Sequence, residues 1–314
     1  MGGNERTPDP RDYPIGAFTP ATFPPSYSTD ISAMTVEMQE HIPDCGANVG
    51  AYVKDQEDSF RGSVEYLWKK IKITDGYPPE DGTDMLSIFG TLKNVGICSN
   101  DLLPTNSALD LASFTDPSMI TPAMDADAAN HKIATYATQF NPSMDDIRAA
   151  IYAHECVVIL MQIGSEFWTP SWNAADILPL RPPQSPVGGH FVLGYGYDQS
   201  NIYFLNEWSS AWGNKGTGYF GSNYISFVKE IGAAVDTSGG TLQRDLSFGM
   251  VNQDVWTLQR FLVKGGYGTF TPTGFFGQKT LAAVVAYQKA KGIQPAAGYV
   301  GPITRGWINK ELSV

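Results

Sequence analysis

The stretch that decides the fold is GGHFVLGYGYDQSNIYFLNEWSSAWGNKGTGYF, residues 188–220. Two runs rich in apolar and aromatic residues, GGHFVLGYGYD and NIYFLNEWS, are separated by turn residues. Such runs predict two β-strands joined by a short turn. Antiparallel neighbours of this kind would bring His190, at the start of the first strand, close to Asn206, at the end of the second.

His190 is the best placed of the four histidines to act as a base. Gly188 and Gly189 precede it, and residues without side chains let another group approach the backbone closely. An Asn206 oxygen that accepts from one ring nitrogen would direct the other at a nucleophile, with Trp208 shielding the bond from water. The alternative is an ordinary hairpin with a polar residue at its rim. The other histidines are expected to be surface or structural residues: His41, His131 and His154.

These residues resemble the His and Asn segments of the papain family of cysteine peptidases. The shared pattern is a His on a strand, a Gly-Tyr pair, Asn-x-Trp and a Trp-Gly-x-x-Gly turn. The resemblance implies an α+β fold with two lobes, one helical and one built on a β-sheet. It also implies a cysteine nucleophile at the start of a helix well upstream.

The upstream stretch QEHIPDCGANVGAY, residues 39–52, allows two alignments. Matching it to the plant and animal signature Cys-Gly-Ser-Cys-Trp puts Asn48 at the nucleophile and Ile42 at the oxyanion-hole glutamine, which implies an inactive copy. The other alignment puts the nucleophile at Cys45 and finds Gln39 six residues earlier, at the glutamine position. The following run is then similar to that of many bacterial members. Because one shift restores both residues, we adopt the second alignment.

The expected chemistry is that of an activated thiol. A cysteine at a helix N-terminus feels the positive end of the helix dipole, and a nearby imidazolium lowers its pKa further. We therefore expect a thiolate–imidazolium pair between Cys45 and His190. By the resemblance, Gln39 and the Cys45 backbone N–H would donate to the oxyanion. We expect Cys98 to end a helix and Cys156 to start a core strand, both as structural thiols. The cysteine spacing matches no metal site, so neither a metal nor a cofactor is expected.

The sequence departs from the family pattern in several places. Glu207 stands where a Ser usually follows the catalytic Asn, and no Trp follows the Cys. An N-terminal arm of 22 residues is too short to resemble the family's inhibitory pro-region, so the means of restraint stays open. Residues 81–83 match the substrate-strand position. The predicted substrate-binding residues are Asp81, Gly82, Gly189 and Trp208.

Composition and charge divide the chain into two parts. Of 314 residues, 42% are hydrophobic and 17% charged, which is typical of a globular protein. The net charge is −11. Residues 251–314 carry seven basic and two acidic residues, a net of +5, which leaves −16 for residues 1–250. We predict an arm (1–22), a peptidase-like domain (23–235), a linker (236–250) and a small helical domain (251–314).

The last segment has its own pattern. DVWTLQRFLVKGG, QKTLAAVVAYQKAKG and PITRGWINKEL predict three helices. TGFFGQKT (273–280) and AGYVGPIT (297–304) form an internal echo, in which a Gly-bounded turn leads into a helix. The unit resembles the peptidoglycan-binding domain attached to many bacterial and phage cell-wall enzymes. A small stabilising bundle is the alternative.

Together these features predict a cysteine endopeptidase that acts on proteins or peptides and is carried to a bacterial wall or surface by its C-terminal domain. The alternatives are an inactive peptidase fold that serves as a binding protein, and a wall hydrolase that cuts peptidoglycan stem peptides. No basic stripe favours nucleic acid, and no apolar run spans a membrane. An extracellular or wall-associated location is favoured, although no signal peptide is visible.

Overall fold

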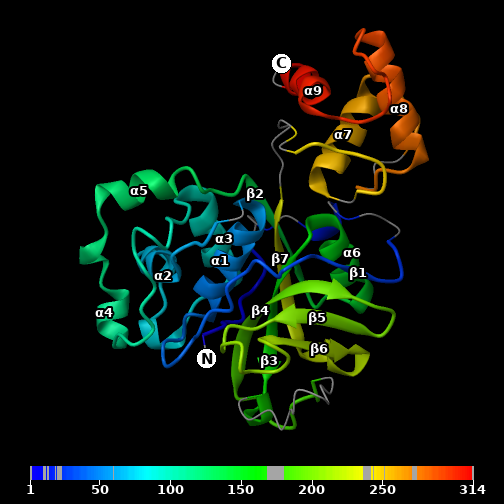
Figure 1. The fold of residues 1–314 in the computed structure, drawn as a ribbon. Coiled ribbons are helices and arrows are strands. Elements are labelled where there is room, and N and C mark those ends of the chain that lie inside the picture. Colours follow the sequence, from blue (N-terminus) through cyan, green and yellow to red (C-terminus); the bar gives the residue numbers. More distant parts are fainter. Residues whose placement is uncertain are drawn as a thin grey trace.

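The chain folds into a helical lobe, a β-sheet lobe and a small helical unit at its C-terminal end, as the computed structural model shows (Figure 1). The predicted α+β class is confirmed. Parts of the predicted arm and linker lie outside the described residues. The structure describes residues 2–9, 12, 14–17, 19, 23–58, 60–167, 180–235, 242, 244–250, 252–270 and 274–312.

The helical lobe is organised around the helix that begins at Cys45. The spacing of Val49, Tyr52 and Val53 in the sequence predicts one apolar face of a helix, and all three side chains lie in the core of this lobe. Side-chain caps start the two helices packed against it: Ser63 accepts from Tyr66 N, and Asp84 from Ser87 N. Its elements are α1 (Cys45–Asp58), α2 (Val64–Lys72), η2 (Pro79–Asp81), α3 (Met85–Asn94), α4 (Leu111–Thr115), η3 (Pro117–Met119) and α5 (Pro122–Ala128).

The second lobe is an antiparallel sheet in the order β2-β7-β3-β4-β5-β6, with β1 paired to β4. The strands predicted to begin at Cys156, Gly188 and Asn201 are confirmed as β3, β4 and β5, and the run GTGYFGSNY (216–224), which also predicts a strand, contains β6. The strands β2 and β7 and the helix α6 were not predicted. The strands are β1 (Tyr27–Ser28), β2 (Thr135–Phe140), β3 (Val157–Ile163), β4 (Gly188–Tyr197), β5 (Asn201–Leu205), β6 (Thr217–Gly221) and β7 (Val228–Val235). The remaining elements of this lobe are α6 (Met144–His154) and the 3-10 turns η1 (Ile15–Ala17), η4 (Ser165–Phe167) and η5 (Ser222–Phe227).

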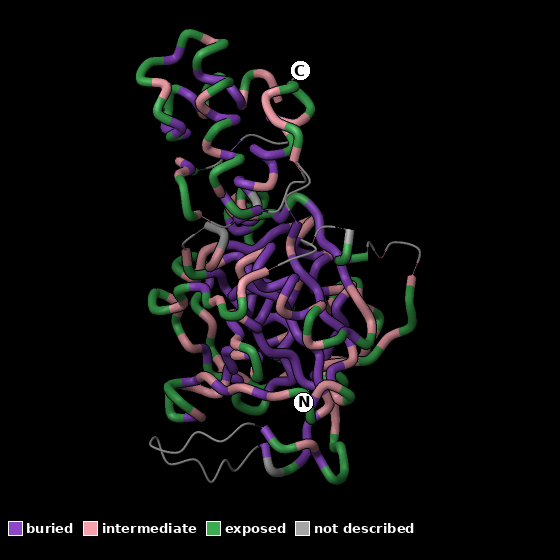
Figure 2. Tube along the Cα trace, turned by 90° about the vertical axis from the view of Figure 1, so that its right-hand side faces the viewer, coloured by how far each residue is buried: buried purple, intermediate pink, exposed green. Residues whose placement is uncertain are grey.

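Both faces of the central strands are buried, which explains the unbroken apolar run of β3. On β3, Val158 and Leu160 join the core of the helical lobe, and Ile159 and Met161 join a second core with α6. A strand covered on both sides reads as continuously hydrophobic instead of alternating. Figure 2 shows the resulting concentration of buried chain in the larger body. The start of β4 thus lies at the contact between the lobes.

The C-terminal unit consists of α7 (Gln253–Lys264), α8 (Gln278–Ala290) and α9 (Pro302–Leu312) around its own apolar core. Leu242 and Leu246, which precede the helices, also pack into this core. The short repeat seen in the sequence is also a repeat in the structure. Gln259 donates to Phe275 O and Thr280 Oγ1 and accepts from Gly274 N. Gln288 makes the same three bonds to Tyr299, Thr304 and Gly298.

Both turns of this repeat need glycine, because Gly274 and Gly298 have φ values of 74° and 83°.

Among the described residues, no helix combines the length and the apolar character that crossing a membrane requires.

Candidate active site

Cys45 is the first residue of α1 and has no exposed surface. Asp44, just before it, accepts the first backbone bond of the helix from Asn48 N. The Asn48 side chain donates to the same carbonyl over 3.1 Å. Asn48 therefore lies in the first turn of the helix, as the adopted alignment predicts. The thiol sits where the free N–H groups of the helix concentrate positive potential.

His190 and Asn206 meet as the hairpin pattern predicts. The antiparallel pairing of β4 with β5 carries the start of one strand to the end of the other. His190 Nε2 lies 2.8 Å from Asn206 Oδ1, and both residues are fully buried. The Trp208 ring lies 5.0 Å from the imidazole ring, and Phe167 packs edge-on at 5.4 Å. Nδ1, the other ring nitrogen, has no hydrogen-bond partner.

Glu207 completes this cluster, although the residue pattern predicts no role for it. Its carboxylate has no exposed surface, and Oε1 lies 3.0 Å from His190 Nε2 without the alignment of a hydrogen bond. The Cys45 sulfur, one ring nitrogen of His190 and one carboxylate oxygen of Glu207 all lie within 4.8 Å of one another. The sequence did give one indication of a role for Glu207, because this acidic residue stands where the related proteases usually have Ser.

Gln39 is held beside the cluster by the backbone. Its N–H donates to Glu207 O over 2.5 Å, and the neighbouring Met38 forms a bridge with Trp208. The side-chain oxygen accepts from Trp208 Nε1 at 3.0 Å, and Nε2 donates to Ile42 O at 2.8 Å. The amide nitrogen carries two protons, and the second acceptor within its reach is the buried Asp44 carboxylate.

The N-terminal arm runs between two walls, one formed by the predicted substrate-strand segment 81–83 and the other by Gly189. Gly3 N donates to Gly189 O on one wall, and Thr83 N and O bond to Gly2 O and Asn4 N on the other. Side chains would prevent this approach. A Cβ on Gly82 would lie 2.1 Å from Gly2 O, and one on Gly189 would lie 2.1 Å from Gly3 O.

The predicted substrate-binding residues are thus divided by what they contact. Gly82 and Gly189 face the arm backbone, and Trp208 binds Gln39 and covers His190. Asp81 is exposed at the end of η2. Thr83, which was not included in the predicted set, supplies the backbone groups of that wall.

The arm is anchored farther along by Arg6. Its guanidinium pairs with Asp12 at 2.7 Å and with the buried Glu230 of β7 at 2.5 Å. Ion pairs with so little exposed surface are costly to break from one side, because the remaining charge is left buried. The arm is therefore an integral part of this arrangement.

Burial under the arm changes the expected protonation. It raises the pKa of the Cys45 thiol, and Glu207 raises it further. Burial also lowers the pKa of His190 to about 4. Both directions favour a neutral thiol and a neutral imidazole over the expected ion pair. The ion pair remains a prediction for a site that the arm has left.

The other candidate residues lie outside this cluster. Cys98 and Cys156 are buried in the apolar cores, and neither forms a disulfide. Cys98 lies beyond the end of α3 instead of closing it, and Cys156 directly precedes β3. His131 stacks on Phe60 with ring centroids 4.0 Å apart.

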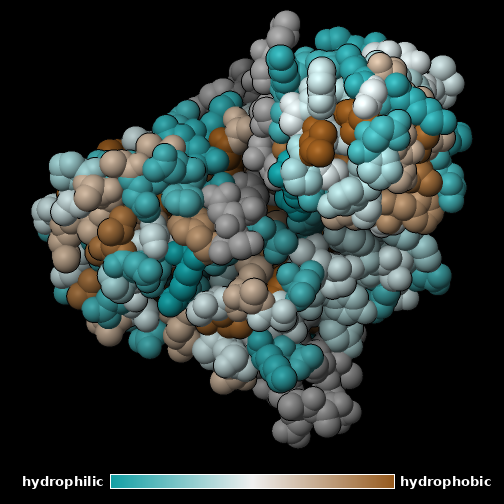
Figure 3. Space-filling model, turned by 45° about the horizontal axis from the view of Figure 1, so that its top comes forward, coloured by the Kyte–Doolittle hydropathy of each residue, from teal (hydrophilic) through white to brown (hydrophobic). Residues whose placement is uncertain are grey.

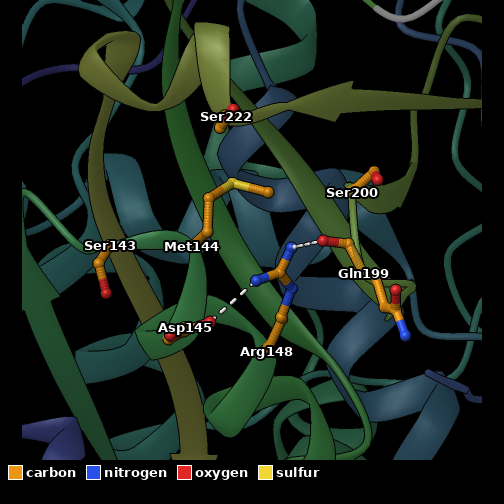
Figure 4. A pocket seen from close by; sticks show the side chains of 7 residues that line it. All are labelled: Ser143, Met144, Asp145, Arg148, Gln199, Ser200 and Ser222. Carbon is orange, nitrogen blue, oxygen red and sulfur yellow. Dashed lines mark hydrogen bonds and ion pairs between the residues drawn. The ribbon is translucent and has the colours of Figure 1, made fainter. Parts of the chain in front are cut away.

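A separate polar pocket lies at the far end of the sheet (Figure 4). It has a volume of about 440 Å³, and Arg148 reaches across it to Asp145 and to Gln199 O. Gln199 follows the end of β4, whereas His190 lies near its start. The pocket is therefore distinct from the Cys45 cluster.

Comparison with known proteins identifies the class of fold. The helical lobe and the β-sheet lobe together have the two-lobed fold of papain-like cysteine proteases, and Cys45, His190 and Asn206 lie close together in it. Residues 251–308 match the family described as "Putative peptidoglycan binding domain". No curated protein sequence matches the chain.

Three solved structures illustrate the likeness. Xylellain, a cysteine protease from Xylella fastidiosa, is 22% identical with a TM-score of 0.60, and the match covers 74% of this chain and 96% of that one. Digestive procathepsin L 3 of Tenebrio molitor is 18% identical with a TM-score of 0.55, covering 71% and 74%. Bromelain from Ananas comosus, in complex with the E64 inhibitor, is 14% identical with a TM-score of 0.52, covering 67% and 98%.

Proposed function

We propose that the protein is a cysteine endopeptidase that uses Cys45, His190 and Asn206 as its triad. The observation that carries the proposal is the convergence of three separate elements. A thiol at the start of α1 lies close to an imidazole whose Nε2 is 2.8 Å from an asparagine oxygen. This is the arrangement of nucleophile, base and orienting group that covalent catalysis requires.

The chemistry follows from this geometry. Once the arm has left, His190 takes the Cys45 proton, and the thiolate attacks the scissile carbonyl carbon. The resulting oxyanion accepts from the Cys45 N–H and from the Gln39 amide, which turns one proton from the Asp44 carboxylate towards it. The imidazolium then protonates the leaving amine as the C–N bond breaks. A water deprotonated by His190 hydrolyses the thioester and regenerates the thiol.

The docked arm makes this enzyme latent. A substrate strand needs the backbone groups of Thr83 and Gly189 that residues 2–4 occupy. Gly2→Val should unseat the arm, because a Cβ there would lie 1.8 Å from Pro43 O. We expect hydrolysis by the full chain to rise about tenfold or more. Gly16→Ala is the matched control, since its Cβ would contact nothing.

The C-terminal unit is proposed to bind peptidoglycan and so to place the enzyme at a bacterial wall or surface. The family description supports this, as do aromatic side chains exposed on the unit. Figure 3 shows hydrophobic patches at the surface of the C-terminal unit. Phe275 and Tyr299, at equivalent positions of the two turns, are 40% and 50% exposed. Their replacement by Ala should weaken sedimentation with purified wall. Met119→Ala, at 57% exposed on the helical lobe, should not.

Two experiments separate the alternatives. A thiol-directed epoxide should label Cys45 in the Gly2→Val chain and fail to label Cys45→Ala. Faster labelling of Cys98 or Cys156 would contradict the assignment. An active enzyme that releases stem peptides from purified wall but leaves casein intact would be a wall hydrolase. A chain that does neither would be a binding protein.

A further inference from the structure

Glu207 carries a charge-bearing group that the proposed reaction does not use. Its side chain is fully buried, and neither carboxylate oxygen makes a hydrogen bond. Burying an acid without partners costs free energy, whether it is ionised or neutral. Asp44 is also buried, and its Oδ1 lacks a partner. Burial raises the pKa of both carboxyl groups, Asp44 raises the pKa of Glu207 further, and Glu207 raises that of Cys45, so a cation at this point would stabilise their ionised forms.

From this arrangement we infer that Cys45, His190 and Glu207 form a binding site for a zinc-type divalent cation. Their donor atoms lie within 4.8 Å of one another, and no other His, Cys, Asp and Glu group in the described part of the chain meets that condition. Thiolate, imidazole and carboxylate are the ligands that Zn²⁺ selects. Ligand distances of about 2.0–2.3 Å imply donor separations of roughly 3.3–3.6 Å, so the side chains need to close by little more than about 1 Å.

The surroundings of His190 suit a metal ligand. Nε2 is hydrogen-bonded to Asn206 Oδ1, whereas Nδ1 has no hydrogen-bond partner. A metal-bound histidine commonly donates its other ring N–H to an oxygen acceptor, which fixes the tautomer and the ring orientation. We therefore assign Nδ1 to the metal and the Asn206 bond to its support. Glu207 Oε1 now lies 3.0 Å from Nε2, and rotation of this unpartnered carboxylate towards the Nδ1 side supplies the third donor.

Metal binding and hydrolysis compete for one sulfur. The thiol releases its proton to solvent when the S–Zn bond forms, so a bound metal blocks the nucleophile reversibly. The three protein ligands leave the fourth position of a tetrahedral site open. The metal site requires no peptide hydrolysis. It can be tested even if the protein proves to be an inactive scaffold.

The test is a titration of Co²⁺, as a coloured substitute for Zn²⁺, into the reduced full-length chain. Wild type and Gly2→Val are both used, so that a seated arm cannot conceal a competent site. We expect one equivalent to produce a sulfur-to-cobalt charge-transfer band and visible bands of tetrahedral intensity, both abolished by Zn²⁺. Absence of these bands in both proteins overturns the proposal.

Variants assign the ligands. Cys45→Ser should remove the charge-transfer band, and Glu207→Gln should raise the Zn²⁺ Kd at least about tenfold. Glu207→Ser is the second variant, in case the Gln chain does not fold. Cys156→Ser and Glu155→Gln are the matched controls and should leave the Kd unchanged. A band that survives Cys45→Ser, or a Kd unaffected by both Glu207 substitutions, contradicts the site.

Discussion

A cysteine, a histidine and a glutamate occur together at two places in this molecule, once in space and once in sequence. Only the set that is close in space brings its donor atoms together. Cys45, His190 and Glu207 are distant in sequence, yet their donor atoms converge within 4.8 Å. His154, Glu155 and Cys156 are consecutive and form no such group. The second set spans the end of α6 and the approach to β3, where Glu155 has a φ of 68°.

The difference arises from what the backbone does at each place. At 154–156 a helix turns into a strand, so successive side chains leave in different directions. Glu155 contacts Gln56 and Arg244, and Cys156 enters the apolar core. At the cluster, the ends of α1, β4 and β5 arrive at one point. Chemistry here comes from the convergence of element ends and not from adjacency in sequence.

The sharpest contrast is between the two cysteines. In the Gly2→Val chain, Cys45→Ala should lower kcat for peptide hydrolysis by at least about 10⁴-fold, because the nucleophile is lost. Cys156→Ala should leave kcat within about twofold, although it can cost ~1–3 kcal/mol of stability as a core truncation. Steady-state kinetics and thermal unfolding measure the two effects. Equal loss of activity in both variants would remove the distinction.

The two histidines provide the next contrast. His190→Ala in the Gly2→Val chain should abolish hydrolysis and raise the Cys45 pKa, because both depend on one thiolate–imidazolium pair. His154→Ala should change neither. Thiolate absorbance against pH gives the pKa directly. A titration that His190→Ala leaves unchanged would show that the pair does not form.

Gln39 and Asn48 test the choice of alignment with a smaller effect. An oxyanion donor acts in the transition state, so Gln39→Ala should lower kcat by about 10²–10³, roughly 3–4 kcal/mol, with KM little changed. Asn48→Ala should be nearly silent in catalysis. A Gln39→Ala protein with wild-type kcat would return the nucleophile position to Asn48 and favour an inactive fold.

The smallest expected effect concerns His154 and stability. Both of its ring nitrogens are buried without hydrogen bonds, and burial lowers its pKa to about 4. Between pH 6.5 and about 4 the unfolded chain binds a proton here that the folded chain does not. This histidine's stabilising contribution is therefore present above pH 6.5 and lost as pH falls towards 4.

Comparison of wild type with His154→Phe separates the contribution of His154 to the pH dependence of stability from that of the carboxyl groups. The difference in unfolding free energy should change by up to about 1.4 kcal/mol per pH unit across that range. Denaturant unfolding at several pH values measures it. A difference that is constant with pH would mean that His154 is protonated or solvated in the folded chain.

The local elements around the site were determined largely by the sequence. The strand pattern of 188–220 predicted the hairpin, and with it the contact of His190 with Asn206. The apolar spacing after Cys45 predicted a helix, and the Gln39 spacing selected its first residue as the nucleophile. These features depend on side-chain periodicity and turn residues within a short stretch, which a sequence displays directly. The repeated Gly-bounded turns of the C-terminal unit were visible for the same reason.

Tertiary structure alone decided the rest. The strands β2 and β7 became recognisable only through pairing with each other and with β3, because their residues lack a clear alternation of their own. The glycines at 82 and 189 were predicted to bind substrate, but only the folded chain placed Gly2 and Gly3 against them. Glu207 was noticed as an exception. Its burial beside Cys45 depends on three elements meeting, which the order of residues does not encode locally.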